Sequence, residues 1–170
     1  MQRIGFYPGT FDPIHDGHIA FALESLEACE LDAVVFLPES SPRNKVNVPS
    51  IISRIEQIKL VTDSHQRLQV RSLESHQFTI RETLSEIQNL FSNAHLTMLA
   101  GSDVALNLCE WKEIKVLLSA CDIAVGMRSK QTEAEIADII TRLKSLHPPL
   151  QATLIHTARS SLASSTLRNK

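Results

Sequence analysis

Residues 7–18 read Tyr-Pro-Gly-Thr-Phe-Asp-Pro-Ile-His-Asp-Gly-His and lie between two regular sequence patterns. The preceding residues, Arg3–Tyr7, form a short apolar stretch that is typical of a buried strand. After the segment, apolar residues recur at helical spacing over residues 19–29. The segment therefore predicts a loop that joins a strand to a helix beginning near Gly17, with Asp16 as the helix N-cap.

The same alternation of strand and helix continues along the chain. Further apolar stretches lie at Ala33–Leu37, Leu68–Ser72, Leu96–Ala100, Cys121–Val125 and Ala152–His156. Helical spacing recurs over residues 80–91 and 136–143, and a Thr132-x-x-Glu135 capping box precedes the second of these. Strict alternation predicts an α/β fold, a Rossmann-like doubly wound parallel sheet. We expect residues 1–170 to form a single domain whose ligands bind beyond the carboxyl ends of the strands.

The composition narrows the class of protein. The 170 residues are 43% hydrophobic and 21% charged, which is typical of a globular domain. The formal net charge of -2 gives no overall field for nucleic acid, so we expect no nucleic-acid partner and only local recognition of phosphate. No secretory signal or membrane-length apolar run is visible, which predicts a cytoplasmic protein without a membrane partner. Cys29, Cys109 and Cys121 lack metal-binding or redox spacing and are expected to be small buried residues.

The opening segment has the chemistry of a phosphate site. Gly9 lets the backbone approach a ligand, the helix start offers unpaired N–H groups, and His15 and His18 can face one anion. Each histidine alone could instead cap the helix or pack in the core. A metal site that adds Asp12 and Asp16 is a further alternative, although the His-x3-His register of a helical zinc pair is missing. The chain contains neither Gly-x-Gly-x-x-Gly nor a Walker motif, which argues against hydride transfer and Walker-type hydrolysis.

Two motifs resemble those of a known superfamily. Gly-Thr-Phe-Asp-Pro-Ile-His-Asp-Gly-His, at residues 9–18, resembles the signature of nucleotidyltransferases with a His-x-Gly-His motif, and Ser-Ser-Thr-Leu-Arg, at residues 164–168, resembles their second signature. The resemblance narrows to nicotinate-nucleotide adenylyltransferase through the middle of the chain. The segments and residues that carry this similarity are Phe78–Leu84, Gly101–Asp103 and Trp111–Ile114, with Lys45 and Arg54 in keeping.

This resemblance implies transfer of AMP from ATP to nicotinate mononucleotide or nicotinamide mononucleotide, with release of pyrophosphate, in NAD biosynthesis. ATP and a pyridine mononucleotide would be the partners, and Mg²⁺ would assist. Because the acceptor phosphate is already ionised, catalysis reduces to alignment and charge stabilisation. The residues that match catalytic positions are His15, His18 and Lys45. Those that match ATP-binding positions are Gly9, Thr10, Phe11, Gly101, Asp103, Ser164, Ser165, Thr166 and Arg168. Those that match the pyridine-nucleotide site are Asn44, Thr79, Trp111 and Lys112, and no residue is assigned as a metal ligand.

Some of these residues also have simpler interpretations. Lys45 could be a solvated lysine of the irregular stretch 38–50, and Trp111 could be a large core residue. Asp103 matches a carboxylate that the family uses toward the ribose or the metal, but it could also be a helix N-cap.

The sequence departs from the family pattern in three places. Arg43-Asn44-Lys45 stands where Pro-His-Lys is usual, and Phe78 stands where tyrosine is common. The sequence ends two residues after Arg168, so the last helix is expected to be shortened. Two alternatives remain: pantetheine-phosphate adenylyltransferase of coenzyme A biosynthesis, which shares the opening motif, and a catalytically weak nucleotide-binding regulatory protein. The choice between nicotinate and nicotinamide and the formation of a homo-oligomer stay open.

Overall fold

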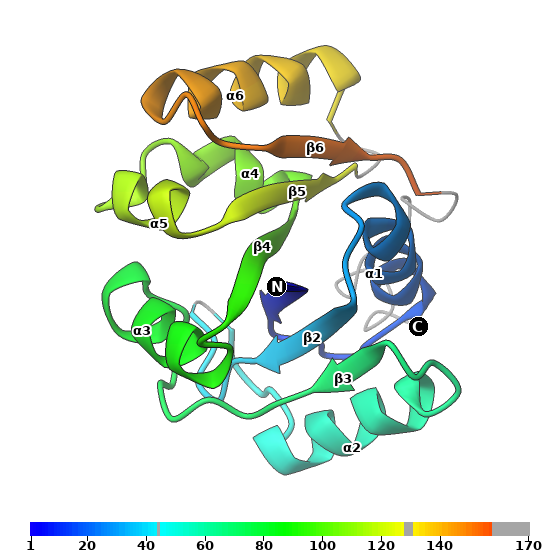
Figure 1. Ribbon diagram of the computed structural model, residues 1–170. Coiled ribbons are helices and arrows are strands. Elements are labelled where there is room, and N and C mark those ends of the chain that lie inside the picture. The colour runs from blue at the N-terminus through cyan, green and yellow to red at the C-terminus, as the bar shows by residue number, and fades with distance from the viewer. Residues whose placement is uncertain (44, 128–130, 158–170) are drawn as a thin grey trace.

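The computed structural model describes residues 1–43, 45–127 and 131–157 as a parallel sheet with helices on both faces (Figure 1). The described strands are β1 (Gln2–Gly9), β2 (Ala33–Pro38), β3 (Leu68–Val70), β4 (Ala94–Gly101), β5 (Asp122–Gly126) and β6 (Ala152–Ile155). They form one six-stranded sheet in the order β3-β2-β1-β4-β5-β6, and every pair is parallel. The predicted α/β class and all six predicted strands are confirmed, although β3 is shorter than expected.

The helices of the described residues divide between the two faces of the sheet. They are α1 (Asp16–Ala28), α2 (Ile51–Thr62), α3 (Ile80–Leu90), α4 (Ser102–Leu108), α5 (Ile114–Ala120) and α6 (Glu133–Leu146). Helices α1 and α2 bury one apolar cluster against the sheet, and α3, α4, α5 and α6 bury a second cluster on the other face. This arrangement is the doubly wound layering that the alternation predicts.

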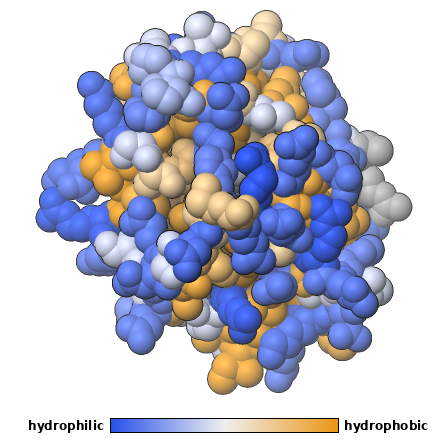
Figure 2. All heavy atoms as spheres, viewed as in Figure 1, coloured by the Kyte–Doolittle hydropathy of each residue, from blue (hydrophilic) through white to orange (hydrophobic). Residues whose placement is uncertain are grey.

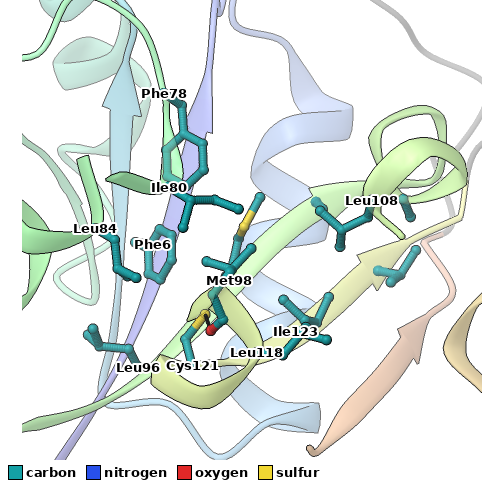
Figure 3. Packing of buried hydrophobic residues seen from close by; sticks show 14 of the residues in the cluster. Phe6, Phe78, Ile80, Leu84, Leu96, Met98, Leu108, Leu118, Cys121 and Ile123 are labelled. Atoms are coloured by element: carbon teal, nitrogen blue, oxygen red, sulfur yellow. Dashed lines mark hydrogen bonds between the residues drawn. The ribbon is translucent and has the colours of Figure 1, made fainter. Parts of the chain in front are cut away.

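The core on the second face ties the central strands to the helices. Figure 3 shows Phe6 of β1 and Met98 of β4 packed among Ile80, Leu84 and Leu118, which come from α3 and α5. Phe6 and Met98 are almost completely buried. Because successive side chains of a strand point to opposite faces, Tyr7 packs in the other cluster, against α1. The central strands β1 and β4 are therefore fixed on both faces.

Three features differ from the prediction. The N-cap of α1 is His15 instead of Asp16, which is the first helical residue. Only Cys121 is buried, while Cys29 and Cys109 are half-buried, and all three are free thiols. Helices α2, α4 and α5 had no predicted counterpart, because α2 exposes Ile52 and Leu60 beside its buried residues, and α4 and α5 have only seven residues each. The Thr132–Glu135 capping box of α6 is confirmed.

The surface of the described residues is mixed. Figure 2 shows mostly hydrophilic residues on the viewed face, with hydrophobic residues in smaller separate areas. In the part of the chain that the structure describes, no helix combines the length and the apolar character needed to cross a membrane.

Candidate active site

The candidate site lies at the carboxyl edge of the sheet, between β1 and β4. From this central pair the chain proceeds outward in opposite directions, through α1 to β2 and through α4 and α5 to β5. Such a reversal of strand order opens a crevice beyond the strand ends. Gly9 ends β1 and Gly101 ends β4, and the two strands are hydrogen-bonded neighbours. The residues predicted around ATP at these two strand ends therefore lie at one edge.

His15 and His18 form a reciprocal capping box at the start of α1. The Nδ1 atom of His15 accepts a hydrogen bond from the backbone N–H of Gly17 at 3.1 Å, and Nδ1 of His18 accepts one from the backbone N–H of His15 at 3.3 Å. The two imidazole rings stack with their centroids 3.8 Å apart. Since both Nδ1 atoms accept, the neutral form of each ring carries its proton on Nε2. The ring planes are inclined by 27°, and in these tautomers the N–H donor of each ring is at Nε2, which in His15 is buried.

Phe11 anchors the loop between β1 and α1, which comprises residues Thr10–His15 and is called the donor loop below. Its ring packs edge-to-face on Tyr7 and on His18, with centroids 5.2 Å apart in both pairs. Phe11 is 2% exposed and has a left-handed φ of 50°. Its side chain therefore belongs to the core, and a contact between Phe11 and ATP would come from its backbone.

Gly9 is constrained by the same ring. A Cβ atom at Gly9 would lie 3.0 Å from Cζ of Phe11, so any side chain there must displace the Phe11 ring. The sequence argument attributed the need for glycine to a close approach of phosphate. Packing against Phe11 is a second reason, which the sequence pattern did not reveal.

The end of β4 continues directly into α4. Gly101 is the N-cap of α4, so the N-cap interpretation of Asp103 is wrong. Asp103 lies in the first turn of α4 and is exposed at the carboxyl edge of the sheet. The neighbouring Ser102 is completely buried, and its Oγ donates to Oε1 of Gln131 at 2.6 Å. Buried Ser102 fixes the turn from which the Asp103 carboxylate projects.

The loop after β2 is bonded to the loop after β3. The backbone N–H of Phe78 donates to Oε1 of Glu39 at 2.7 Å, and Oγ of Ser40 is hydrogen-bonded to Nδ1 of His76 at 2.8 Å. Arg43 donates from Nε to the Gln77 side chain at 2.9 Å. Residues 39–43 are therefore held to residues 76–78 by several contacts, and we call these two segments the acceptor loops. Lys45 follows on the same stretch and is exposed.

Arg54 of α2 is a buried charge that the candidate list did not include. It is 1% exposed, and its guanidinium donates to backbone carbonyls of three loop residues, Thr10, Ser40 and Pro49. Burial lowers the pKa of this guanidinium, and the negative charges of Asp12 and Glu39 partly offset that effect. The sequence showed Arg54 only as in keeping with the family resemblance and gave it no role, because its partners are carbonyl groups of distant loops.

Thr79 and Trp111 lie near each other at the starts of α3 and α5. Thr79 is the N-cap of α3, and its Oγ1 accepts from the backbone N–H of Glu82 at 3.2 Å. The ring of Phe78 lies 6.1 Å from that of Trp111, and Trp111 is half-buried against the core of the second face. Lys112 is exposed beside it. One part of the Trp111 side chain therefore contacts the core, and another part remains accessible.

The remaining candidates fall outside the described residues. These are Asn44, Ser164, Ser165, Thr166 and Arg168. For a metal, the described residues contain no group of three or more His, Cys, Asp or Glu side chains that could hold an ion. The described side chains therefore do not enclose a cation by themselves. They fit a cation such as Mg²⁺ only if substrate phosphates supply most of its ligands.

The chain is similar in sequence to known proteins. A model of the cytidylyltransferase-like family matches residues 6–168. A Neisseria gonorrhoeae protein named "Probable nicotinate-nucleotide adenylyltransferase" is 38% identical over 133 residues, which cover 75% of this chain and 66% of that protein, just under two thirds of its length. A Clostridium perfringens protein of the same name is 30% identical over 172 aligned residues, which cover 91% of this chain and 85% of that protein.

Solved structures share the fold. The Plasmodium falciparum nicotinic acid mononucleotide adenylyltransferase complexed with NaAD has a TM-score of 0.77 at 18% identity, covering 99% of this chain and 83% of that one. The same enzyme complexed with APC has a TM-score of 0.78 at 16% identity, with the same coverage. At this identity the likeness supports the architecture.

Proposed function

The chain belongs to the cytidylyltransferase-like family, and we propose that it is an adenylyltransferase that transfers AMP from ATP to nicotinate mononucleotide and releases pyrophosphate. The observation that carries this proposal is the pair of stacked imidazoles at the start of α1, beside the ends of β1 and β4. The named relatives are nicotinate-nucleotide adenylyltransferases, and they do not favour the pantetheine-phosphate or regulatory alternatives. We further propose that residues 1–170 act as one nucleotidyltransferase domain.

The proposed reaction is an in-line displacement at the α-phosphorus of ATP. An oxygen of the acceptor phosphate forms the new bond to phosphorus, and the bond to the β-phosphate oxygen breaks with its electron pair leaving on pyrophosphate. The attacking oxygen is ionised at neutral pH, so no general base is required. The protein therefore has to hold the two nucleotides in line and stabilise the charge that develops on the phosphate oxygens.

The donor side of this site would be built from the first strand and helix. Backbone N–H groups of Gly9, Thr10 and Phe11 would approach the phosphates, and the Nε2–H groups of His15 and His18 would donate to the oxygens that gain charge. The support is that both Nδ1 atoms are already committed as acceptors within the capping box. With both Nδ1 atoms committed, Nε2 is the atom from which each ring would donate to the transition state.

The ribose and the pyrophosphate end would be held by other elements. Gly101 and Asp103 at the end of β4 would face the adenosine ribose. Ser164, Ser165, Thr166 and Arg168 would hold the departing pyrophosphate, and Lys45 would add a positive charge to the same phosphates. Adenylyl transfer from ATP usually needs a divalent metal; we propose Mg²⁺, which would be carried mainly by the ATP phosphates and would neutralise their charge.

The acceptor would lie between the acceptor loops and the start of α5. Trp111 would stack on the pyridine ring, while Asn44, Thr79 and Lys112 would contact the rest of the mononucleotide. The support is that Phe78 and Trp111 form a ring pair at this place and that Trp111 is only half-buried. The accessible face of an indole ring suits stacking on a planar heterocycle.

An acceptor screen tests the proposal. Pyrophosphate release is measured with ATP and Mg²⁺ plus nicotinate mononucleotide, nicotinamide mononucleotide, phosphopantetheine, or no acceptor. We expect turnover with a pyridine mononucleotide and none with phosphopantetheine. Turnover with phosphopantetheine alone would reject the proposal, and tight ATP binding without pyrophosphate from any acceptor would support the regulatory alternative.

The substitution Trp111→Ala tests the acceptor site separately. Removal of the stacking face should raise the KM for the pyridine mononucleotide by about tenfold, the equivalent of one aromatic contact of about 1.4 kcal/mol. The KM for ATP should change by less than about threefold. An equal rise in both KM values would show that Trp111 acts through the core and not through the acceptor.

A further inference from the structure

The guanidinium of Arg54 lies at the junction of loops from three strands. Its Nη1 donates to the carbonyl of Thr10 at 2.8 Å, on the donor loop after β1. Its Nη2 donates to the carbonyl of Ser40 at 3.4 Å, on the acceptor loop after β2. The nearby Glu39 carboxylate is bonded in turn to the backbone N–H of Phe78, on the acceptor loop after β3. One buried cation thus connects the donor loop to both acceptor loops.

The contact is more specific than a positive charge alone. A guanidinium is a rigid planar group with five N–H donors, so its Nη1 and Nη2 atoms hold two carbonyls at a fixed separation. The third bond, from Nε to the carbonyl of Pro49 at 3.0 Å, fixes the guanidinium relative to the start of α2. A lysine in this place would supply one flexible ammonium and could not span the same carbonyls.

The loops that Arg54 and Glu39 connect are those proposed to hold the two substrates. Thr10 is in the loop proposed to cradle the triphosphate, and Phe78 directly precedes Thr79, which is proposed to face the acceptor. In-line transfer depends on the separation and angle between the two bound nucleotides, and small displacements have large effects on rate. Arg54 itself is 1% exposed, so it would act through the loops and not by touching a substrate.

We propose that Arg54 is a positioning residue for adenylyl transfer: it fixes the donor loop relative to the acceptor loops, so that the two nucleotides are aligned for attack. This inference rests on the proposed function for its effect on rate. Its structural part, the joint fixing of both loops, is independent of which acceptor is used.

The first test compares Arg54→Lys with Arg67→Lys. Arg67 is the control for a guanidinium that bridges carbonyls: it also donates to the backbone carbonyls of Leu31 and Asp32, but it is exposed and lies at the opposite edge of the sheet. Binding of ATP alone and of nicotinate mononucleotide alone is measured by calorimetry, which also gives the fraction of competent sites. For Arg54→Lys we expect kcat per competent site to fall at least tenfold while each dissociation constant changes less than threefold. Arg67→Lys should keep kcat within twofold.

Chemical rescue provides a second readout. Arg54→Ala leaves a cavity of the shape of the lost group, and millimolar guanidinium ion should restore part of kcat, whereas the same ion should not raise kcat of the wild type or of Arg67→Lys. A loss of kcat that merely follows the loss of competent sites, with no rescue, would overturn the proposal and leave Arg54 a residue of general stability.

Hydrogen exchange separates this inference from the proposed function. If the wild type releases no pyrophosphate with any acceptor, the proposed function fails, and backbone amide exchange in Arg54→Lys still decides the structural part. We expect faster exchange at residues 9–12 and 39–41 together, with no change there in Arg67→Lys. Unchanged exchange in either segment would refute the connection between the loops.

Discussion

At the scale of single residues, the two histidines of the opening segment form the cap of α1 and are also the proposed phosphate donors. Each Nδ1 caps a backbone N–H at the start of α1, which leaves each Nε2 as the donor. The sequence predicted both histidines at the site with a cap as an alternative role of each, but it named Asp16 as the N-cap, because histidine is not among the usual N-cap residues; the structure places His15 there. Arg54 was noted as in keeping with the family resemblance but received no role at the site, because its partners are backbone carbonyls, which no sequence motif displays.

His18→Ala tests the proposed donor role. Loss of one preorganised donor should lower kcat by about 10²–10³, or about 3–4 kcal/mol, with the fold preserved. His95→Ala is the control, because it removes a histidine that pairs with Asp122 away from the candidate site, at the start of β4. Steady-state kinetics and circular dichroism measure the two effects. A kcat change below threefold in His18→Ala would remove His18 from the mechanism.

At the scale of elements, the strands were predictable and several helices were not. Buried parallel strands are short apolar runs, and all six were recognised from that pattern. Helix α2 escaped because Ile52 and Leu60 are exposed, so its apolar residues do not follow one face. Helices α4 and α5 have seven residues each, too short to display a helical period. These omissions affect the predicted site less, since its proposed donor side is formed by β1, α1 and the loop between them, all of which were predicted.

The start of α1 allows the cap and the chemistry to be separated. His15→Ser keeps a side-chain acceptor at the N-cap but removes the imidazole, whereas His15→Ala removes both. We expect both variants to lose kcat by about 10²-fold, while only His15→Ala loses about 1 kcal/mol of unfolding free energy.

Thr132→Ala is the matched control for stability in the His15 comparison. It breaks the capping box of α6, which contains no imidazole, so its unfolding free energy should fall by about 1 kcal/mol while kcat falls much less than in either His15 variant. Urea unfolding and initial rates give both quantities. Retention of kcat in His15→Ser would show that His15 acts only as a cap.

At the scale of the whole molecule, the strand order brings the ends of β1 and β4 together at the candidate site. The order β3-β2-β1-β4-β5-β6 follows from alternating strands and right-handed crossovers, but alternation alone does not fix which strands are central. The motif at residues 9–18 predicts binding at the end of the first strand, and the structure adds that β1 and β4 are the neighbours at the reversal. The acceptor side depends on contacts between loops distant in sequence, which is why only part of it was predictable.

The reactivity of the three thiols measures how well the core is packed around them. Burial raises the pKa of the Cys121 thiol to about 12, and burial also raises the pKa values of Cys29 and Cys109. In the folded protein at pH 8, a disulfide reagent should therefore leave Cys121 unmodified, and full reaction should require denaturant. Because the folded state keeps the Cys121 proton, its contribution to stability is complete below the unfolded thiol pKa of about 8.5 and declines as the pH rises toward 12. Rapid modification of Cys121 without denaturant would contradict its burial in the second-face core, between the end of α5 and the start of β5.

The central claim is that the segment from Gly9 to His18 cradles the triphosphate at the junction of β1 and β4. A crystal structure with a non-hydrolysable ATP analogue and nicotinate mononucleotide measures this most directly. The account predicts the phosphates at the start of α1, within hydrogen-bond distance of Nε2 of His15 and His18, with the acceptor phosphate in line. An analogue bound elsewhere, with both imidazoles directed away from it, would contradict the account.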